Sequence, residues 1–219
     1  FYDEENVIAA MRLVRPVPVE TDFSACGTTA RFHNAGHIIG SAFVVINIEG
    51  RRVLFSGDVG RYGRALLNDP SPIGEADTIL CESTYADRVH PSDALDQLSE
   101  VLVAGVERGG AIVIPAFAVE RSQDILLSIG ELQRREPALA KVPVFLDSPM
   151  ASKVDELFER FPDAHRPIPN DSANTPFGCR NLTVAVTTEQ SKAINAQRGP
   201  VIIVSASGMA SGGRVLHHL

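Results

Sequence analysis

The chain has 219 residues, enough to bury a substantial core in one large domain or two small ones. Hydrophobic residues make up 44% and charged residues 21%, an ordinary balance for a globular protein. No apolar run approaches the roughly 20 residues that span a bilayer, so we expect no membrane segment. The net charge is −7, and no part of the chain predicts a basic nucleic-acid-binding patch by composition alone.

The three cysteines, Cys26, Cys81 and Cys179, are odd in number and far apart. A disulfide framework is therefore not expected, and a reducing cytoplasm is the better prediction. The absence of a CxxC pair also argues against a zinc site made of thiolates.

The first part of the chain predicts one short helix and several strands. Acidic residues open a helical segment, two prolines end it, and Glu49-Gly50 is a tight-turn signal between two strand-like runs. The predicted elements are a helix at 3–14 and strands at 42–48, 51–56 and 77–82.

The pattern then changes to short apolar strands alternating with amphipathic helices. Strands are predicted at 111–115, 143–147, 182–186 and 200–204, and helices at 92–108, 119–135, 150–161, 188–197 and from Gly213 onward. A Pro- and Asn-rich loop at 163–181 interrupts this part. The alternation predicts an α/β fold with a parallel sheet covered on both faces, with a boundary near 88–91.

His37 and Asp58 are the residues whose chemistry points most clearly to a metal. His37 lies in FHNAGHIIGSAF, where Gly36 and Gly40 would allow the backbone to approach another group closely. Asp58 follows a strand-like run on the turn SGDVG. Taken singly, the first reads as a loop histidine and the second as an Asp capping its own turn. Together they are the ligand types of hydrolytic metal sites, in which a carboxylate can bridge two ions.

Several segments in order carry a family resemblance. AGHIIGSAF and LFSGDVGR resemble the third and fourth metal-binding motifs of the metallo-β-lactamase fold. ILCESTYADR resembles the acidic first motif of its β-CASP branch of nucleic-acid-processing nucleases. PAFAVERSQDIL, FLDSPMA and SASGMASGGRVLHHL resemble later β-CASP segments, most like those of RNA-processing members akin to the cleavage-and-polyadenylation endonuclease.

The resemblance implies a partial αββα metallo-β-lactamase domain at 1–88 and a Rossmann-like β-CASP domain at 89–219, incomplete at its C-terminus. His37 matches a ligand of one metal ion and Asp58 a carboxylate that bridges two, in a site that holds two Zn²⁺ in the complete enzyme. Glu82 matches an acidic residue near the catalytic centre that orients a downstream His. By local sequence alone, Glu82 is a strand-end residue in a local ion pair.

The resemblance is incomplete. The HxHxDH signature that supplies most metal ligands in the family is absent, and the later β-CASP histidines would fall beyond Leu219. We therefore expect a fragment of a zinc-dependent ribonuclease, acting on RNA rather than DNA, with little activity in the isolated chain. Endonuclease versus exonuclease action and a homodimeric state stay open.

Ser207 and Arg214 are the candidate substrate-binding residues. They follow the strand at 200–204, on the edge where open α/β sheets bind ligands, and could hold a phosphate. The alternative is an ordinary Gly- and Ser-rich loop with a surface arginine, and Arg121 is a weaker candidate of the same kind. His217 and His218 are expected to be structural, and His165 to lie in a solvated loop.

Two other functions remain to be weighed. A metallo-β-lactamase-fold hydrolase of thioesters or small esters would share the His37 and Asp58 motifs but lack ESTYADR and the long β/α segment. A non-catalytic binding or structural module is the second alternative, because this chain offers two good metal ligands where the family uses six or seven.

Overall fold

The computed structural model describes residues 2–168 and 176–219, which form two compact units. Unit 1 comprises Phe1–Tyr62 and Asp69–Thr84, and unit 2 comprises Gly63–Asn68 and Tyr85–Leu219. The domain bounds 1–88 and 89–219 stay a prediction, and the structure adds that segment 63–68 belongs with the second unit.

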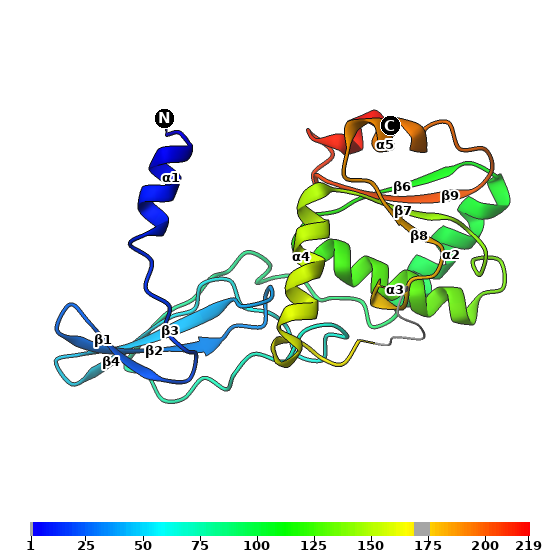
Figure 1. Cartoon of the computed structure of the whole chain (residues 1–219). Helices are drawn as coiled ribbons and strands as arrows, with labels where there is room; N and C mark the ends of the chain where they lie inside the picture. The colour runs from blue at the N-terminus through cyan, green and yellow to red at the C-terminus, as the bar shows by residue number, and fades with distance from the viewer. Residues whose placement is uncertain (1, 169–175) are drawn as a thin grey trace. The chain divides into compact units, whose positions relative to one another are not determined.

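Unit 1 is built on a five-stranded sheet of order β1-β2-β3-β4-β5 (Figure 1). Its elements are α1 (Glu4–Met11), β1 (Asp22–Ala25), β2 (Thr28–Asn34), β3 (Ala42–Ile48), β4 (Arg51–Phe55) and β5 (Thr78–Leu80). Neighbouring strands are antiparallel except β4 and β5, which are parallel. The predicted turn joins β3 to β4, since Glu49 and Gly50 have φ of 51° and 79°.

The hairpin of β1 and β2 was not predicted from the sequence. Its strands hold alternating polar and apolar side chains, and the rings of Phe23 and Phe32 stack across it with centroids 5.0 Å apart. The buried core of unit 1 is small and centres on Ala35, Phe43 and Leu54. Helix α1 is capped by Asp3, which accepts from the Asn6 N–H at 2.9 Å, and it ends before the predicted bound at 14.

Unit 2 holds a four-stranded, wholly parallel sheet of order β6-β9-β7-β8, as the alternating pattern predicted. Its strands are β6 (Ala111–Pro115), β7 (Val144–Asp147), β8 (Leu182–Val184) and β9 (Val201–Ser205). Its helices are α2 (Ala94–Arg108), α3 (Arg121–Arg135), α4 (Pro149–Arg160) and α5 (Thr188–Ile194), with short 3₁₀ turns η1 (Pro162–Ala164), η2 (Pro176–Gly178) and η3 (Arg214–His217). The α/β fold is confirmed.

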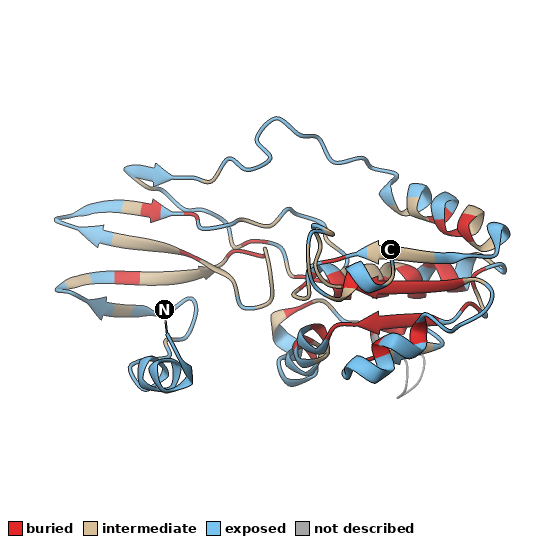
Figure 2. Cartoon of the chain, turned by 90° about the horizontal axis from the view of Figure 1, so that it is seen from above, coloured by how far each residue is buried: buried red, intermediate tan, exposed pale blue. Residues whose placement is uncertain are grey.

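The central strands β7 and β9 are buried on both faces, which explains why they read as continuous apolar runs (Figure 2). On one face, Phe145, Val201 and Ile203 pack against Ile194 of α5. On the other face, Gly105 of α2 lies against Ile112, and α3 contacts β9.

Helix ends in unit 2 follow local sequence signals. Ser148 caps α4 by accepting from the Ala151 N–H at 3.2 Å, and α5 begins in a capping box between Thr187 and Gln190. The helix expected from Gly213 onward is only the 3₁₀ turn η3. The predicted loop at 163–181 falls partly outside the described residues.

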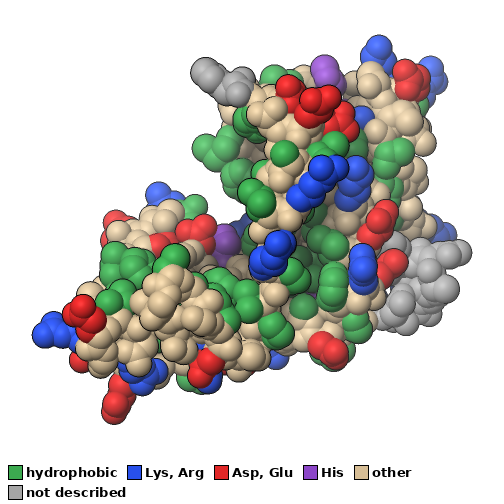
Figure 3. All heavy atoms as spheres, turned by 60° about the vertical axis from the view of Figure 1, so that its left-hand side comes forward, with side chains coloured by type: hydrophobic (Ala, Val, Ile, Leu, Met, Phe, Trp, Pro, Cys, Tyr) green, Lys and Arg blue, Asp and Glu red, His purple; other side chains and the backbone are tan. Residues whose placement is uncertain are grey.

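His165 is not in a solvated loop as predicted. It is 9% exposed, and its ring nitrogens contact the carbonyl oxygens of Arg166 and Phe158 at 2.7 and 2.9 Å. A search of the described residues finds no helix that is long and apolar enough to cross a bilayer. On the face in Figure 3, acidic, basic and hydrophobic side chains are interspersed, with no extended area of one charge.

Candidate metal and substrate site

The His37 loop follows β2 and is closed by its own hydrogen bonds. The Ser41 hydroxyl accepts from the backbone N–H of His37 at 3.0 Å and of Ile38 at 3.2 Å. The Ala35 N–H donates to the Ser41 carbonyl at 3.0 Å. Gly36 has φ of 63°, a region that favours glycine. These contacts fix the backbone from which the His37 imidazole projects.

The Asp58 loop follows β4 and packs directly on the His37 loop. The Gly60 N–H donates to the Ala35 carbonyl at 2.8 Å. A Cβ added at Gly60 would overlap the Gly36 carbonyl group, so only glycine permits this approach. The two loops are thereby brought together, and His37 Nε2 lies 3.9 Å from Asp58 Oδ2.

Glu82 follows β5 and ties these loops to the next strand. Its Oε1 accepts from the Val59 N–H at 3.1 Å and its Oε2 from the Thr84 N–H at 3.2 Å, while its own N–H donates to the Ser56 hydroxyl at 3.0 Å. Hydrogen bonds from Thr84 and from the Val59 backbone lower the pKa of the Glu82 carboxyl, and nearby His37 adds to this effect. Glu82 is therefore ionised at neutral pH.

The His37 and Asp58 pair fits two ligands of a metal ion. Two donor atoms about 2.1 Å from a tetrahedral ion lie about 3.4 Å apart, close to the 3.9 Å found here. Both side chains are accessible, with 45% and 70% of their surface exposed. Within residues 2–168 and 176–219, however, no three His, Cys, Asp or Glu side chains form a metal-holding group. An ion at this position would need ligands besides these two.

Ser207 lies in the loop after β9, in unit 2. Its N–H donates to the Gly212 carbonyl at 3.4 Å, and its carbonyl accepts from the Ala210 N–H at 3.1 Å. The Val215 N–H donates to the Ala206 carbonyl at 2.9 Å, which closes the loop at its other end. Ser207 is therefore presented by a folded loop at the carboxyl edge of the sheet.

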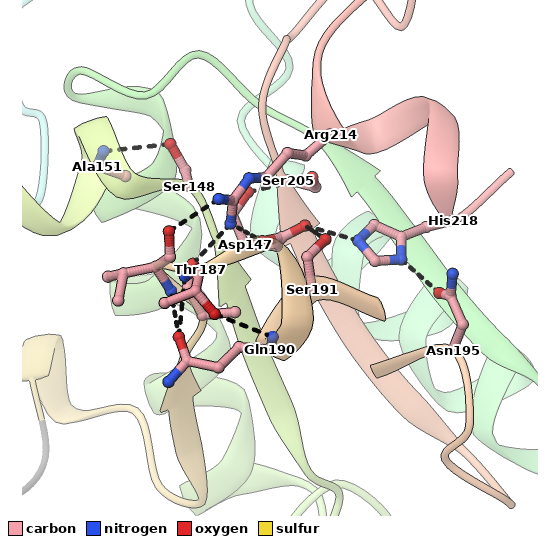
Figure 4. A network of polar contacts seen from close by, with 12 residues as sticks. Asp147, Ser148, Ala151, Thr187, Gln190, Ser191, Asn195, Ser205, Arg214 and His218 are labelled. Carbon is pink, nitrogen blue, oxygen red and sulfur yellow. Dashed lines mark hydrogen bonds and ion pairs between the residues drawn. The ribbon is translucent and has the colours of Figure 1, made fainter. Parts of the chain in front are cut away.

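Arg214 points back into the fold (Figure 4). Its Nη1 donates to Asp147 Oδ1 at 2.7 Å and to the Ala185 carbonyl at 3.1 Å, and its Nη2 donates to the Val186 carbonyl at 2.8 Å. These contacts hold the loop after β9 against β7 and β8. The assignment of Ser207 and Arg214 to substrate binding stays a prediction.

Asp147 is the centre of this network and was not singled out from the sequence. Its carboxylate is fully buried and also accepts from the Ser191 hydroxyl at 2.6 Å and contacts His218 Nε2 at 2.8 Å. Burial pushes the pKa of Asp147 upward, but the hydrogen bonds from Ser191, His218 and Arg214 outweigh it and hold the pKa below its usual range. His218 thus has a structural position, as expected.

A second buried carboxyl cluster was also missed. Arg64 pairs with both Glu120 and Asp124 at the start of α3. Burial, with Asp124 adding to it, raises the pKa of Glu120 to about 8. Glu120 has φ of 69°, a conformation that favours glycine. A glutamate gives no sign of this conformation in the sequence.

Comparison with known proteins finds a family model that resembles the second part of the chain. Residues 122–219 match the Beta-Casp domain. The chain is 38% identical over 228 residues to Ribonuclease TTHA0252 of Thermus thermophilus, an alignment that covers 100% of the chain and 51% of that protein.

Two further relatives extend the comparison. The chain is 34% identical over 196 residues to the RNase J-like protein of Methanocaldococcus jannaschii, covering 86% of the chain and 45% of that protein. It is 27% identical over 221 residues to Cleavage and polyadenylation specificity factor 73 of Drosophila melanogaster, covering 97% of the chain and 31% of that protein. The chain spans about half the length of the first two relatives.

Proposed function

We propose that the whole protein is a metal-dependent ribonuclease, on the premise that this chain belongs to the β-CASP branch of the metallo-β-lactamase superfamily. The observation that carries the proposal is the approach of His37 and Asp58 to 3.9 Å, on two loops that meet at Gly60, where a Cβ would overlap the Gly36 carbonyl group. The relatives named above are described as a ribonuclease, an RNase J-like protein and a cleavage factor.

His37 and Asp58 would hold the metal through an imidazole nitrogen and a carboxylate that can bridge two ions. We propose two zinc ions, because nitrogen and oxygen donors of this kind suit zinc and a bridged pair suits phosphodiester hydrolysis. When bound, zinc supplies a Lewis acid that lowers the pKa of water and offsets charge on a phosphoryl oxygen.

Glu82 would support this site through the backbone of the Asp58 loop. Its ionised carboxylate fixes the Val59 N–H, next to Asp58, and so orients the Asp58 loop. The free lone pairs of its oxygens could also orient a histidine supplied by the rest of the protein. In unit 2, Ser207 would contact the phosphate backbone of RNA. Arg214 would serve substrate binding by holding the Ser207 loop in place through its contacts with Asp147, Ala185 and Val186.

The test uses the purified whole protein, a labelled single-stranded RNA and a matched DNA. Chelation of metal should abolish RNA cleavage, and zinc should restore it. Asp58→Asn and His37→Ala should each lower zinc content and reduce kcat/KM by at least about 100-fold, the scale expected when a metal ligand or its support is lost. His90→Ala, at an exposed loop position, is the control and should be neutral.

RNA cleavage that survives both chelation and the Asp58→Asn change would refute the metal assignment. No cleavage of RNA by the metal-loaded whole protein would refute the ribonuclease itself and favour a non-catalytic module. Hydrolysis of thioesters or small esters is disfavoured because residues 122–219 match the Beta-Casp domain.

A further inference from the structure

The carboxyl edge of the unit 2 sheet carries an exposed apolar side chain after every strand. Phe117 follows β6, Met209 follows β9, Met150 follows β7 and Val186 follows β8, so the four occur in the order of the strands across the sheet. Their exposed fractions are 56%, 72%, 62% and 45%. Single exposed apolar residues are common, but four that follow neighbouring strands at one sheet edge suggest a binding surface.

Phe117 is the aromatic member of this edge, and its backbone is firmly held. Its carbonyl accepts from the Ser122 N–H at 3.1 Å and from the Ser122 hydroxyl at 2.8 Å. Ser122 is itself fully buried in the first turn of α3. An exposed aromatic ring on a fixed backbone loses little conformational freedom when a ligand stacks on it.

The Phe117 ring also lies directly against the loop that presents Ser207. A Cβ added at Gly208 would come within 2.9 Å of Phe117 Cδ2 and of the Phe117 nitrogen. One part of the ring therefore covers the Gly208 backbone, while more than half of the residue stays exposed. An aromatic surface and the candidate phosphate-contacting Ser207 are thus neighbours in the fold.

The charges around this edge suit an anionic ligand. In the four loops between these strands and the elements that follow them, at 116–120, 148, 185–187 and 206–213, the one acid is Glu120, which is buried and paired with Arg64. Exposed Arg121 lies in the first turn of α3, together with Asp124, which pairs with Arg64. Exposed Lys153 lies just past the first turn of α4, and exposed Glu189 lies in α5. The positive ends of the α3 and α4 dipoles also lie at this edge. Within these four loops, therefore, no exposed acid would repel an anionic ligand.

We propose that Phe117, flanked by Met209, is a stacking platform for an unstacked base of single-stranded RNA whose backbone passes Ser207. This inference rests on the proposed ribonuclease function and names the contact that would bind a base beside the phosphate. Aromatic rings stack on any base, so the platform would add affinity without sequence preference.

The experiment measures binding of a fluorescein-labelled, uncleaved single-stranded RNA by the whole protein, with chelator present to prevent hydrolysis. Phe117→Ala should weaken binding by about 5- to 150-fold, which corresponds to the loss of one base–aromatic stack, and Phe117→Trp should retain tight binding. Phe161→Ala removes an exposed phenylalanine at the other end of α4 and should leave binding unchanged.

A series of RNAs with one abasic position each separates stacking from a structural role. One abasic position should weaken binding to the wild type about as much as Phe117→Ala does, and should weaken binding to Phe117→Ala no further. Equal affinity of wild type and Phe117→Ala, or full additivity of the two changes at every position, would overturn the platform. A lower Tm of Phe117→Ala with no abasic position coupled to it would instead identify the edge as a packing or protein-docking surface.

The failure of this inference is distinguishable from failure of the proposed function. If the metal-loaded wild type cleaves RNA and Phe117→Ala binds RNA as tightly as the wild type, the ribonuclease stands and the platform falls. If the wild type neither binds nor cleaves RNA, both fall.

Discussion

Replacing Asp147 by alanine should lower the free energy of unfolding of unit 2 by about 3–5 kcal/mol, the range for removing one partner of a buried charge pair. The carboxylate is fully buried and makes contacts of 2.6 Å with Ser191, 2.7 Å with Arg214 and 2.8 Å with His218. Hydrogen bonds to charged groups are worth about 1.5–3 kcal/mol each. The net loss is smaller than their sum because Arg214, 22% exposed in its side chain, can regain water.

The control is Asp96→Ala, which removes an ion pair of the same length at the surface. Asp96 and Arg135 are 2.8 Å apart but 63% and 44% exposed, so the loss should be no more than about 1 kcal/mol. Urea unfolding followed by far-UV circular dichroism suits the assay, because the chain has no tryptophan. If the two variants lose stability within about 0.5 kcal/mol of each other, burial does not set the strength of the Asp147 network.

Two other predictions test the site loops and the buried carboxyl cluster. Gly60→Ala would force apart the loops of His37 and Asp58, so the zinc content of the whole protein should fall several-fold. Gly110→Ala is the control, because a Cβ at that position meets only open space, and it should leave the zinc content unchanged. Equal zinc content in both variants would contradict the loop contact. Because the pKa of Glu120 is raised from 4.5 to about 8, the folded chain holds a proton that the unfolded chain releases, and this stabilisation is present below about pH 4.5 and lost as pH rises toward 8. Glu120→Gln should therefore flatten the fall in Tm between pH 5 and pH 8, and an unchanged slope would refute this assignment.

Unit 2 was predictable because its local signals agree. Its strands are apolar throughout and its helices amphipathic, so the parallel sheet and most helix bounds follow from periodicity. The hairpin of β1 and β2 was not predicted because its strands are rich in polar residues such as Thr29 and Arg31. These residues form strands through their pairing with neighbouring strands and not through their composition.

The polar networks could not be predicted, since they join residues that are remote in sequence. Asp147 contacts Ser191, Arg214 and His218, which are 44 to 71 positions later in the chain. The sequence shows an acid at the end of a strand and a conspicuous pair of histidines, but not which of them meet. The parallel pairing of β7 with both β8 and β9 brings them to one edge.

The candidate metal site was predictable only in part from the sequence. Gly36 was expected to allow a close approach of backbone, and its carbonyl group lies where a Cβ of residue 60 would be. Gly60 is therefore needed for the contact, and the φ of 63° at Gly36 favours glycine there. Glu82 read locally as a strand-end acid in an ion pair, yet its carboxylate accepts the Val59 N–H of the Asp58 loop. Three segments that follow β2, β4 and β5 are thus one hydrogen-bonded assembly. A change at Glu82 should therefore act on the position of Asp58 first, so its effect on zinc content and its effect on turnover should appear together.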